Sequence, residues 1–413
     1  MAKLKRENIA ERASLQEPLY SGRAAIYSFF SCAGFLDLGF ELANGKPYTI
    51  RMANEIDKDF RECYRYAREH LNAPIHVTDD FIFPNSIEDF VQWGGKPRKC
   101  FEDTYKKFES LLKADKDANN IIGFIGGPPC PDFSVAGLNA GKNGNVGPLS
   151  SKYVRLINQE EPHFFLFENV KGLFSSGKHH TYFRSLCLKL REKYYISYRL
   201  VNALWYGVPQ YRERLIIIGI RRDLLSGFSH KKLDKELEWE SFQWFKEAVI
   251  ENRTQWPSSQ PYNPDPNLPR PEGNRGIADL TVHDWWVKND VVHHPNQINQ
   301  TCPRESTRYK YESICEGNTV GKSYHRLHRW KYAFTACYGH NEIPLHPWEP
   351  RRISVAEALA TQSLPADFSF PTTMGISALF KAVGNGVPFL MSQRLADMIN
   401  SFLVKHNIYG GAQ

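Results

Sequence analysis

Apolar runs of strand length alternate with amphipathic stretches of helix length through the first half of the chain. Runs such as Ala24 to Phe30 and Ile121 to Ile125 have the composition of buried strands, whereas Asp57 to His70 is predicted to be a helix. This alternation predicts an α/β fold with a mostly parallel sheet covered by helices on both faces. The predicted strands are 24–30, 49–54, 75–78, 121–125, 164–167, 198–204 and 214–220.

The pattern changes after Arg222. Residues 223–250 are charged and predicted to be helical, and six prolines between 257 and 271 exclude regular structure there. Residues 280–350 are predicted to form short strands and turns without the β-α-β period, which indicates a second domain.

The last part of the chain is predicted to be helical again. Ser354 to Glu357 is a capping box that starts a helix. Gly384 to Pro388 is a turn, and the apolar stripe from Val387 to Leu403 needs a sheet to cover. We therefore predict a first domain at 1–222 with an N-terminal arm at 1–23, a second domain at 223–375, and a segment at 376–413 that returns to the first domain.

Composition narrows the class of protein. With 413 residues, 42% hydrophobic and 23% charged, the chain has the composition of a globular protein of two or three domains. It has neither an apolar run long enough for a membrane span nor a secretory signal, so we expect a cytoplasmic protein without membrane contact. The eight cysteines include no Cys-x-x-Cys pair, which argues for reduced thiols and against a structural metal site.

One cysteine lies where a reactive group is expected. Cys130 follows Gly126, Gly127, Pro128 and Pro129 at the end of a predicted buried strand. The prolines stiffen the loop, and open α/β sheets bind ligands at the ends of their strands. A plain turn cysteine is the alternative at this point, because the stretch by itself cannot identify a nucleophile.

Other strand ends supply possible partners for this thiol. A small-residue turn follows the first strand, and Glu55 lies about 20 positions further on, where an acidic residue can accept hydrogen bonds from a ribose. Glu168 ends the predicted strand at 164–167, and residues 207–214 link the last two strands. The glycine-rich stretch 137–147 is predicted to be a mobile lid beside Cys130.

Basic and aromatic residues are interleaved between Arg304 and Lys331, where seven Lys or Arg residues occur with three Glu. This composition suits contact with phosphates and bases, although a solvated surface loop is equally compatible with it. The net charge of +7 adds only weak support for a polyanionic partner.

Together, these stretches resemble the DNA (cytosine-5) methyltransferase family of bacterial restriction-modification systems. The resemblance covers most of 24–221 and 351–404, in an order that fits the family. It implies a Rossmann-like S-adenosylmethionine-dependent methyltransferase sheet and a smaller, irregular target-recognition domain. The matching stretches are 30–41, 54–57, 126–134, 167–170, 207–214, 351–365 and 384–388.

The resemblance also implies the chemistry. Cys130 would add to carbon 6 of a cytosine flipped out of duplex DNA, and Glu168 would stabilise ring nitrogen 3. Arg214 would hold the carbonyl oxygen of the base, while Arg212 and Gln210 would fix the surrounding loops. The residues expected at the DNA are Ser134, Gln210, Arg304, Arg308, Lys310, Arg326 and Arg329.

The family's cofactor is S-adenosyl-L-methionine, which leaves as S-adenosyl-L-homocysteine. Phe30 would lie near its adenine, Glu55 would bind its ribose, and Asp79 or Asp80 would take the adenine amino group. Cys32 and Phe35 stand where the family usually has glycines, and Pro131 replaces a usual glutamine. The remaining residues that the resemblance assigns to the cofactor are Ala33, Gly34, Ile56, Phe81, Pro129, Leu149, Asn385 and Val387.

The function predicted from the sequence is therefore sequence-specific methylation of duplex DNA by a monomer, with a restriction endonuclease as a possible functional partner. RNA cytosine methylation by the same chemistry and a catalytically inactive DNA-binding relative are the alternatives. A dinucleotide oxidoreductase is disfavoured, because few glycines of its fingerprint are present.

Overall fold

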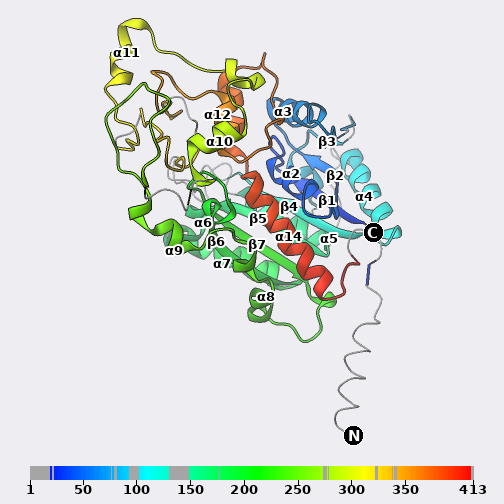
Figure 1. The fold of residues 1–413 in the computed structure, drawn as a ribbon. Helices are drawn as coiled ribbons and strands as arrows, with labels where there is room; N and C mark the ends of the chain where they lie inside the picture. The colour runs from blue at the N-terminus through cyan, green and yellow to red at the C-terminus, as the bar shows by residue number, and fades with distance from the viewer. Residues whose placement is uncertain are drawn as a thin grey trace.

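The computed structural model places the two ends of the described chain side by side, where Tyr20 pairs with Tyr409 (Figure 1). Among the described residues, no helix has the length and apolar character needed to cross a membrane. The structure describes residues 19–20, 23–75, 77–78, 81–92, 102–129, 148–175, 177–272, 277, 279–320, 324–336, 338 and 342–410.

Seven strands form one sheet in the order β3-β2-β1-β4-β5-β7-β6. All pairs from β3 to β5 are parallel, and β7 runs antiparallel to both β5 and β6. The predicted mostly parallel sheet is confirmed. Because β2 and β4 lie on opposite sides of β1, the carboxyl ends of β1 and β4 form the switch point at which such sheets bind ligands. The strands are β1 (Ala24–Phe29), β2 (Tyr48–Asn54), β3 (Ile82–Phe83), β4 (Ile121–Gly126), β5 (Phe164–Val170), β6 (Tyr194–Asn202) and β7 (Glu213–Arg221).

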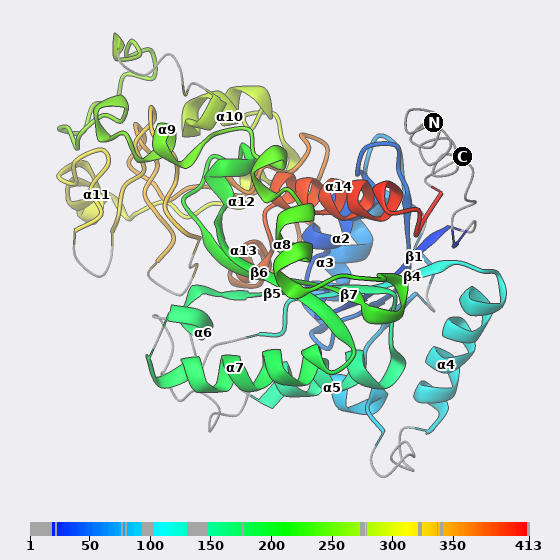
Figure 2. The ribbon, with the colours of Figure 1, turned by 90° about the horizontal axis from the view of Figure 1, so that it is seen from below.

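Helices cover both faces of the sheet, as the alternation predicts (Figure 2). Along β1, Ala24 and Ile26 belong to the core on one face, and Tyr27 and Phe29 belong to the core on the other. This alternation follows from the two-residue period of a strand. The first face carries α2 (Phe35–Glu41), α8 (His230–Glu236) and α14 (Phe389–Lys405), and the second carries α4 (Glu102–Asp117), α5 (Pro148–Glu160) and α7 (Gly177–Arg191).

A third core joins the turn after β1 to helices from the second half of the chain. Phe35 and Leu38 pack in it with Trp286, Leu359 and Leu379. The division into domains at 222 and 375 stays a prediction, and this core crosses both of those boundaries. The remaining helices are α3 (Lys58–Glu69), α6 (Lys171–Ser175), α9 (Glu247–Glu251), α10 (Val282–Lys288), α11 (Glu305–Glu312), α12 (Val355–Thr361) and α13 (Ile376–Asn385), with 3-10 helices at 87–90, 203–206, 222–224, 239–242, 253–255 and 295–298.

The third strand lies later in the chain than predicted. It is Ile82–Phe83, which pairs with the end of β2, and the described residues of 75–78 form no strand. Val77 packs beside Ile82 in a small core instead of joining the sheet. Both segments are apolar, so the pattern alone does not distinguish the strand from the packed loop.

The prediction of short strands across 280–350 is wrong. The segment contains α10, α11 and a 3-10 helix, and its described residues make only isolated β-bridges. The predicted capping box at Ser354 is confirmed, because Ser354 Oγ accepts from the Glu357 amide at 3.1 Å and Glu357 Oε2 accepts from the Ser354 amide at 2.7 Å.

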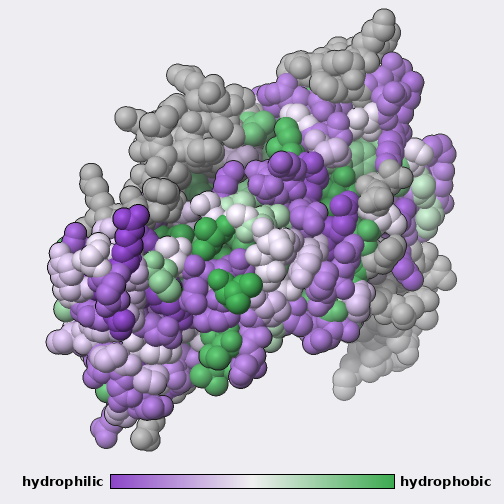
Figure 3. Space-filling view, turned by 90° about the horizontal axis from the view of Figure 1, so that it is seen from above, coloured by the Kyte–Doolittle hydropathy of each residue, from purple (hydrophilic) through white to green (hydrophobic). Residues whose placement is uncertain are grey.

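The surface is mixed in character. On the face shown in Figure 3, hydrophobic residues form small patches that are surrounded by hydrophilic ones. Scattered apolar residues of this kind are normal on a folded protein.

Replacement of Leu395 tests how much the packing of α14 on the sheet contributes to the stability of the protein. Leu395 is fully buried in the core between α14 and the sheet. We expect Leu395→Ala to destabilise the protein by about 2–5 kcal/mol, because truncation of a buried leucine leaves a cavity. The measurement is thermal unfolding.

Val404→Ala on the same helix is the matched control, since Val404 is 40% exposed. Equal shifts in melting temperature for the two variants would contradict the packing of α14 on the sheet through Leu395.

Candidate active site

A pocket opens at the switch point between β1 and β4. It lies between the turn after β1, the end of β4, Glu168 on β5 and the turn that precedes α14. Residues predicted from the sequence for two different tasks, Phe30 and Asn385 for the cofactor and Glu168 for the base, therefore line one pocket. The lining residues are Ser28, Phe29, Phe30, Ser31, Cys32, Phe35, Leu36, Asp37, Gly127, Glu168, Asn385, Gly386 and Val387.

The turn after β1 is tightly wound. Phe30, Cys32 and Gly34 have φ values of 56°, 50° and 77°, which reverse the chain before α2 begins. Only glycine adopts this region without strain, so the two other residues must be held there by their surroundings. Phe35 then packs so closely on Gly386 that a Cβ atom at position 386 would lie 2.1 Å from its ring.

Glu55 holds this turn from the side of β2. One carboxylate oxygen accepts from the Cys32 amide and the other from the Asp57 amide, each at 2.8 Å. Burial raises the pKa of Glu55, and these backbone hydrogen bonds oppose the rise. The neighbouring Ile56 is 66% exposed, so an apolar surface lies open beside a buried carboxylate.

A buried network lies behind the turn, and the sequence pattern did not reveal it. Arg68 lies over the Tyr64 ring and donates to Gly34 O at 3.2 Å and to Glu41 at 2.8 Å. Tyr64 in turn donates to Asp37 at 2.9 Å. Arg68 has no exposed surface, and the only sequence signal for its role is its position on the buried face of α3.

Of the other predicted cofactor residues, Asn385 and Val387 line the pocket, and Ala33, Phe81, Pro129 and Leu149 are not among its lining residues. Ala33 is fully buried in the third core, and Phe81 and Leu149 are half-buried at the edges of the sheet cores. Pro129 and Asn385 are exposed, and Val387 is buried. Asp79 and Asp80 lie outside the described residues.

Glu168, which lines the pocket, forms an ion pair with Arg214. Arg214 Nε lies 2.8 Å from Glu168 Oε1, and the side chains are only 10% and 11% exposed. The strand register explains the contact, because Glu168 pairs with Ile216 and Arg214 lies two residues before Ile216 on the same face of β7. Burial raises the pKa of Glu168, and Arg214 and Arg212 oppose the rise.

Arg212 and Gln210 are buried, and their side chains form hydrogen bonds with backbone groups. Arg212 donates to Gly384 O at 2.9 Å and to Gly386 O at 3.0 Å, and it is 2% exposed. Gln210 has no exposed surface and bonds to the backbone of Thr361 and Ala336. The structure therefore does not support the prediction that Gln210 contacts DNA, because its amide is used inside the protein.

Asn169 is a further residue to which the sequence pattern assigned no role. Its Nδ2 donates to Pro128 O at 3.1 Å and so links β5 to the loop that leads to Cys130. The predicted nucleophile Cys130, the predicted DNA contact Ser134 and the predicted lid at 137–147 lie outside the described residues.

The expectation that Arg326 and Arg329 present their charges to DNA is contradicted. Both side chains have no exposed surface. Arg326 donates to the carbonyl oxygens of Tyr311, Ile314, His346 and Glu349, and burial lowers its pKa to about 10.

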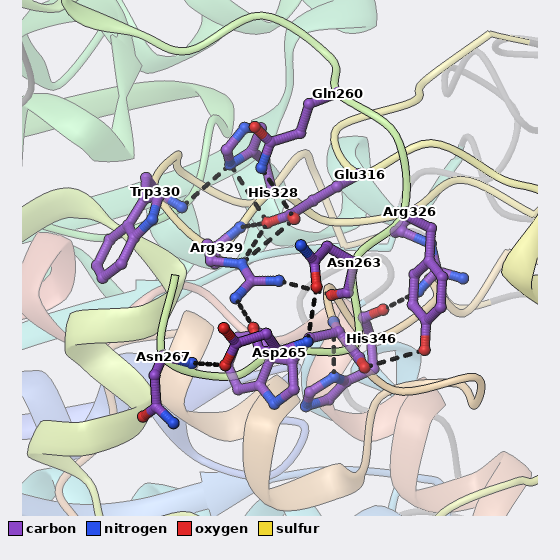
Figure 4. Close-up of polar contacts among 12 residues, drawn as sticks. Gln260, Asn263, Asp265, Asn267, Glu316, Arg326, His328, Arg329, Trp330 and His346 are labelled. Carbon is purple, nitrogen blue, oxygen red and sulfur yellow. Dashed lines mark hydrogen bonds and ion pairs between the residues drawn. The ribbon is translucent and has the colours of Figure 1, made fainter. Parts of the chain in front are cut away.

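Arg329 is buried with a carboxylate partner, as Figure 4 shows. Its Nε lies 3.0 Å from Glu316 Oε1, and Glu316 is itself fully buried. The guanidinium also donates to the carbonyl oxygens of Asn263 and Asp265, so it ties the proline-rich segment 257–271 to the segment that contains Glu316. Basic residues in such a loop look alike in sequence whether they face solvent or carbonyl groups.

Three other predicted DNA contacts are exposed. Arg304, Arg308 and Lys310 lie on or beside α11, which projects from the molecule away from the sheet (Figure 1). Arg308 is paired within the helix with Glu312 at 2.9 Å. These residues have the accessibility that Arg326 and Arg329 lack.

Comparisons with known proteins agree with this architecture. The sequence profile of the C-5 cytosine-specific DNA methylase family matches residues 90–401. The chain is 40% identical over 385 residues to the Type II methyltransferase M.NmeDI of Neisseria meningitidis serogroup C, which covers 93% of this chain and 85% of that protein. It is 28% identical over 401 residues to the Type II methyltransferase M.FnuDI of Fusobacterium nucleatum, with 92% and 94% covered. The Dnmt2 methyltransferase of S. pombe has the same fold, with a TM-score of 0.54, 12% identity, and coverage of 93% of this chain and 98% of that one.

The raised pKa of Glu168 makes a prediction for stability. A carboxyl group whose pKa is higher in the folded state binds protons more tightly there, so stability falls as pH rises from about 4 through the folded pKa. Glutamine does not titrate. We therefore expect the melting temperature of Glu168→Gln, relative to that of the wild type, to be higher at pH 8 than at pH 4.

Glu109→Gln on the exposed side of α4 controls for the loss of one negative charge. If the melting temperature of Glu168→Gln, relative to that of the wild type, is instead lower at pH 8 than at pH 4, folding lowers the pKa of Glu168 rather than raising it.

Proposed function

This chain belongs to the C-5 cytosine-specific DNA methylase family and is a DNA cytosine-5 methyltransferase, and we propose that it acts on a cytosine flipped out of duplex DNA through a covalent bond to Cys130. The proposal rests on the buried Glu168–Arg214 ion pair, because Glu168 lines the same pocket as the turn after β1. The pair offers a proton and a positive charge at one point, which a cytosine ring requires when a nucleophile adds to it.

Each residue of the pair has a separate task. Carbon 5 of cytosine is too weakly nucleophilic to take a methyl group, and addition of the Cys130 thiolate at carbon 6 makes it enamine-like. Electron density then accumulates at ring nitrogen 3, where a protonated Glu168 donates a hydrogen bond. Nε and Nη1 of Arg214 are bound to Glu168 and to the carbonyl of Glu213, so its Nη2 is the donor for the carbonyl oxygen of the base. The proton on carbon 5 is then lost to solvent, the electrons of that bond restore the double bond between carbons 5 and 6, and the carbon–sulfur bond breaks so that Cys130 leaves as a thiolate.

The residues around the pocket fit S-adenosyl-L-methionine. A buried carboxylate at Glu55 beside an exposed Ile56 suits a ribose with an adenine next to it. Glu55 adjoins the pocket through its hydrogen bond to the amide of Cys32, a lining residue. Phe30, Asn385 and Val387 line the pocket and would hold the rest of the molecule. When bound, S-adenosyl-L-methionine supplies an electrophilic methyl group.

The loops around the base are held by buried side chains. Arg212 binds the carbonyl groups of Gly384 and Gly386, which flank Asn385. Asn169 binds the carbonyl of Pro128, two residues before Cys130. We assign Arg212, Gln210 and Asn169 positioning tasks, because their polar groups are bonded to backbone.

The recognition of DNA is assigned to the region around α11. Arg304, Arg308 and Lys310 are the exposed cations there, and they would contact phosphates. The relatives M.NmeDI and M.FnuDI are Type II methyltransferases, which favours a role in restriction-modification with a cognate endonuclease. Such an enzyme acts in the cytosol of a bacterium or archaeon, where the DNA lies, and we propose that it acts there as a monomer.

The proposal is tested by incubation with tritiated S-adenosyl-L-methionine and a long DNA of mixed sequence, followed by bisulfite sequencing. Methylation of cytosine within one short repeated motif is the expected result. If DNA is not methylated although the cofactor binds, structured RNA is the next substrate to test. No activity on either would identify an inactive DNA-binding relative.

Cys130→Ser tests the covalent step. A serine hydroxyl is far less ionised than a thiol, so methyl transfer should fall below about 10% of wild type while cofactor binding is retained. DNA that carries 5-fluorocytosine should trap the wild-type enzyme as a covalent complex, since fluorine cannot leave as a proton does. Cys187→Ser is the control, because Cys187 lies on α7, is buried in the core between that helix and the sheet, and is not among the residues that line the pocket. Residual activity above about 10% would remove Cys130 as the nucleophile.

The exposed side chains of Arg304, Arg308 and Lys310 are expected to determine part of the salt dependence of DNA affinity. Replacement of Arg304, Arg308 and Lys310 together by alanine should reduce the slope of log K against log salt by up to about 3, since each phosphate contact contributes about 0.9. Fluorescence anisotropy across a salt series measures this slope. Replacement of Lys231, Lys232 and Lys235 on α8 removes the same charge from another face, and an equal loss of slope would move the DNA-binding surface away from α11.

A further inference from the structure

Gly127 lies directly against the carboxylate of Glu168. A Cβ atom built on Gly127 would lie 2.7 Å from Glu168 Oε2, 3.7 Å from Cδ and 3.9 Å from Cβ. All three nearest atoms thus belong to this one side chain. A separation of 2.7 Å is closer than a carbon atom and an oxygen atom can pack, so any side chain at position 127 would displace the carboxylate.

The carboxylate has little freedom to move aside. Glu168 Oε1 is held by Arg214 Nε at 2.8 Å, and the Glu168 side chain is 11% exposed. The backbones on either side are also fixed relative to each other. Gly126 pairs with Phe167 in the parallel ladder, and Asn169 binds the carbonyl of Pro128. The space between Gly127 and Glu168 therefore cannot widen without breaking the sheet register.

The two carboxylate oxygens differ in their surroundings. Oε1 is bonded to Arg214, whereas no donor among the described residues lies within hydrogen-bonding distance of Oε2. Oε2 is also the atom that faces Gly127, which lines the same pocket. Protonation at Oε1 would break the charged contact with Arg214, so Oε2 is the oxygen able to carry a proton and donate it.

We propose that Gly127 is a positioning residue for the methyl-transfer reaction, because the absence of a side chain there leaves Glu168 Oε2 free to reach the base while Oε1 stays on Arg214. The inference rests on the proposed function of Glu168. It identifies which carboxylate oxygen acts and why glycine is required at the end of β4.

The backbone of Gly127 does not by itself require glycine. It is not among the described glycines with positive φ, so alanine can adopt the same conformation. Gly127→Ala therefore tests the contact with Glu168 in a chain that is able to fold.

The experiment is a double-mutant cycle on the full chain with Gly127→Ala, Glu168→Ala and the double variant. The measurement is the single-turnover rate of tritiated methyl transfer at saturating DNA and S-adenosyl-L-methionine. With Glu168 present, Gly127→Ala should lower the rate by about 10²-fold, because displacement of a reacting group by about 1 Å costs this much. In the Glu168→Ala background, where the carboxylate is gone, the same change should alter the rate by no more than about twofold.

Gly177→Ala is the matched control, since a Cβ atom at that position would meet nothing within 4 Å. Its rate should equal that of the wild type, and cofactor affinity and melting temperature are recorded for every variant. An equal loss from Gly127→Ala in both backgrounds would show that Gly127 acts through the loop and would overturn this inference alone. Full activity of Gly127→Ala would do the same. Full activity of Glu168→Ala would overturn the proposed role of Glu168 and this inference with it.

Discussion

The reversed direction of β7 is the constraint on which the site depends. In a parallel sheet only the carboxyl ends of strands meet at the ligand-binding edge. Because β7 runs antiparallel to β5, its first residues reach that same edge, and Arg214 meets Glu168. A parallel β7 of nine residues would place Arg214 roughly 25 Å away at the opposite edge. One strand reversal therefore brings a cation to a carboxylate that an all-parallel sheet would leave alone.

A residue at the same edge of the sheet also holds the part of the pocket that the turn before α14 forms. Arg212, two residues before Arg214, holds the carbonyl groups of Gly384 and Gly386 in the turn that precedes α14. A buried guanidinium is costly unless its donors are satisfied, so these contacts stabilise the return of the chain to the sheet. The pocket wall formed by Asn385, Gly386 and Val387 is thus held by Arg212, the residue that directly precedes β7.

Sequence reasoning succeeded where the signal is periodic or local. The sheet, its covering helices and the capping box at Ser354 follow from hydrophobic spacing and from one short motif. It failed at the third strand, because apolar residues in a packed loop resemble those in a short strand. It also failed for Arg326 and Arg329, whose partners are mostly main-chain carbonyl groups. Carbonyl groups are present at every position, so no residue pattern marks them, and the contact of Gly127 with Glu168 is equally invisible without coordinates.

Because Arg326 supports α11, the sequence of this helix can change during evolution while its position is kept. The guanidinium binds the carbonyl groups of Tyr311 and Ile314 at the end of that helix, and those of His346 and Glu349 in a distant segment. A carbonyl group remains when its side chain is replaced, so substitutions at these four positions keep the acceptors. The exposed side chains of α11 are therefore not needed for these contacts, which hold the helix in place. A lineage can change the chemistry of this surface one residue at a time while a single retained arginine preserves its geometry.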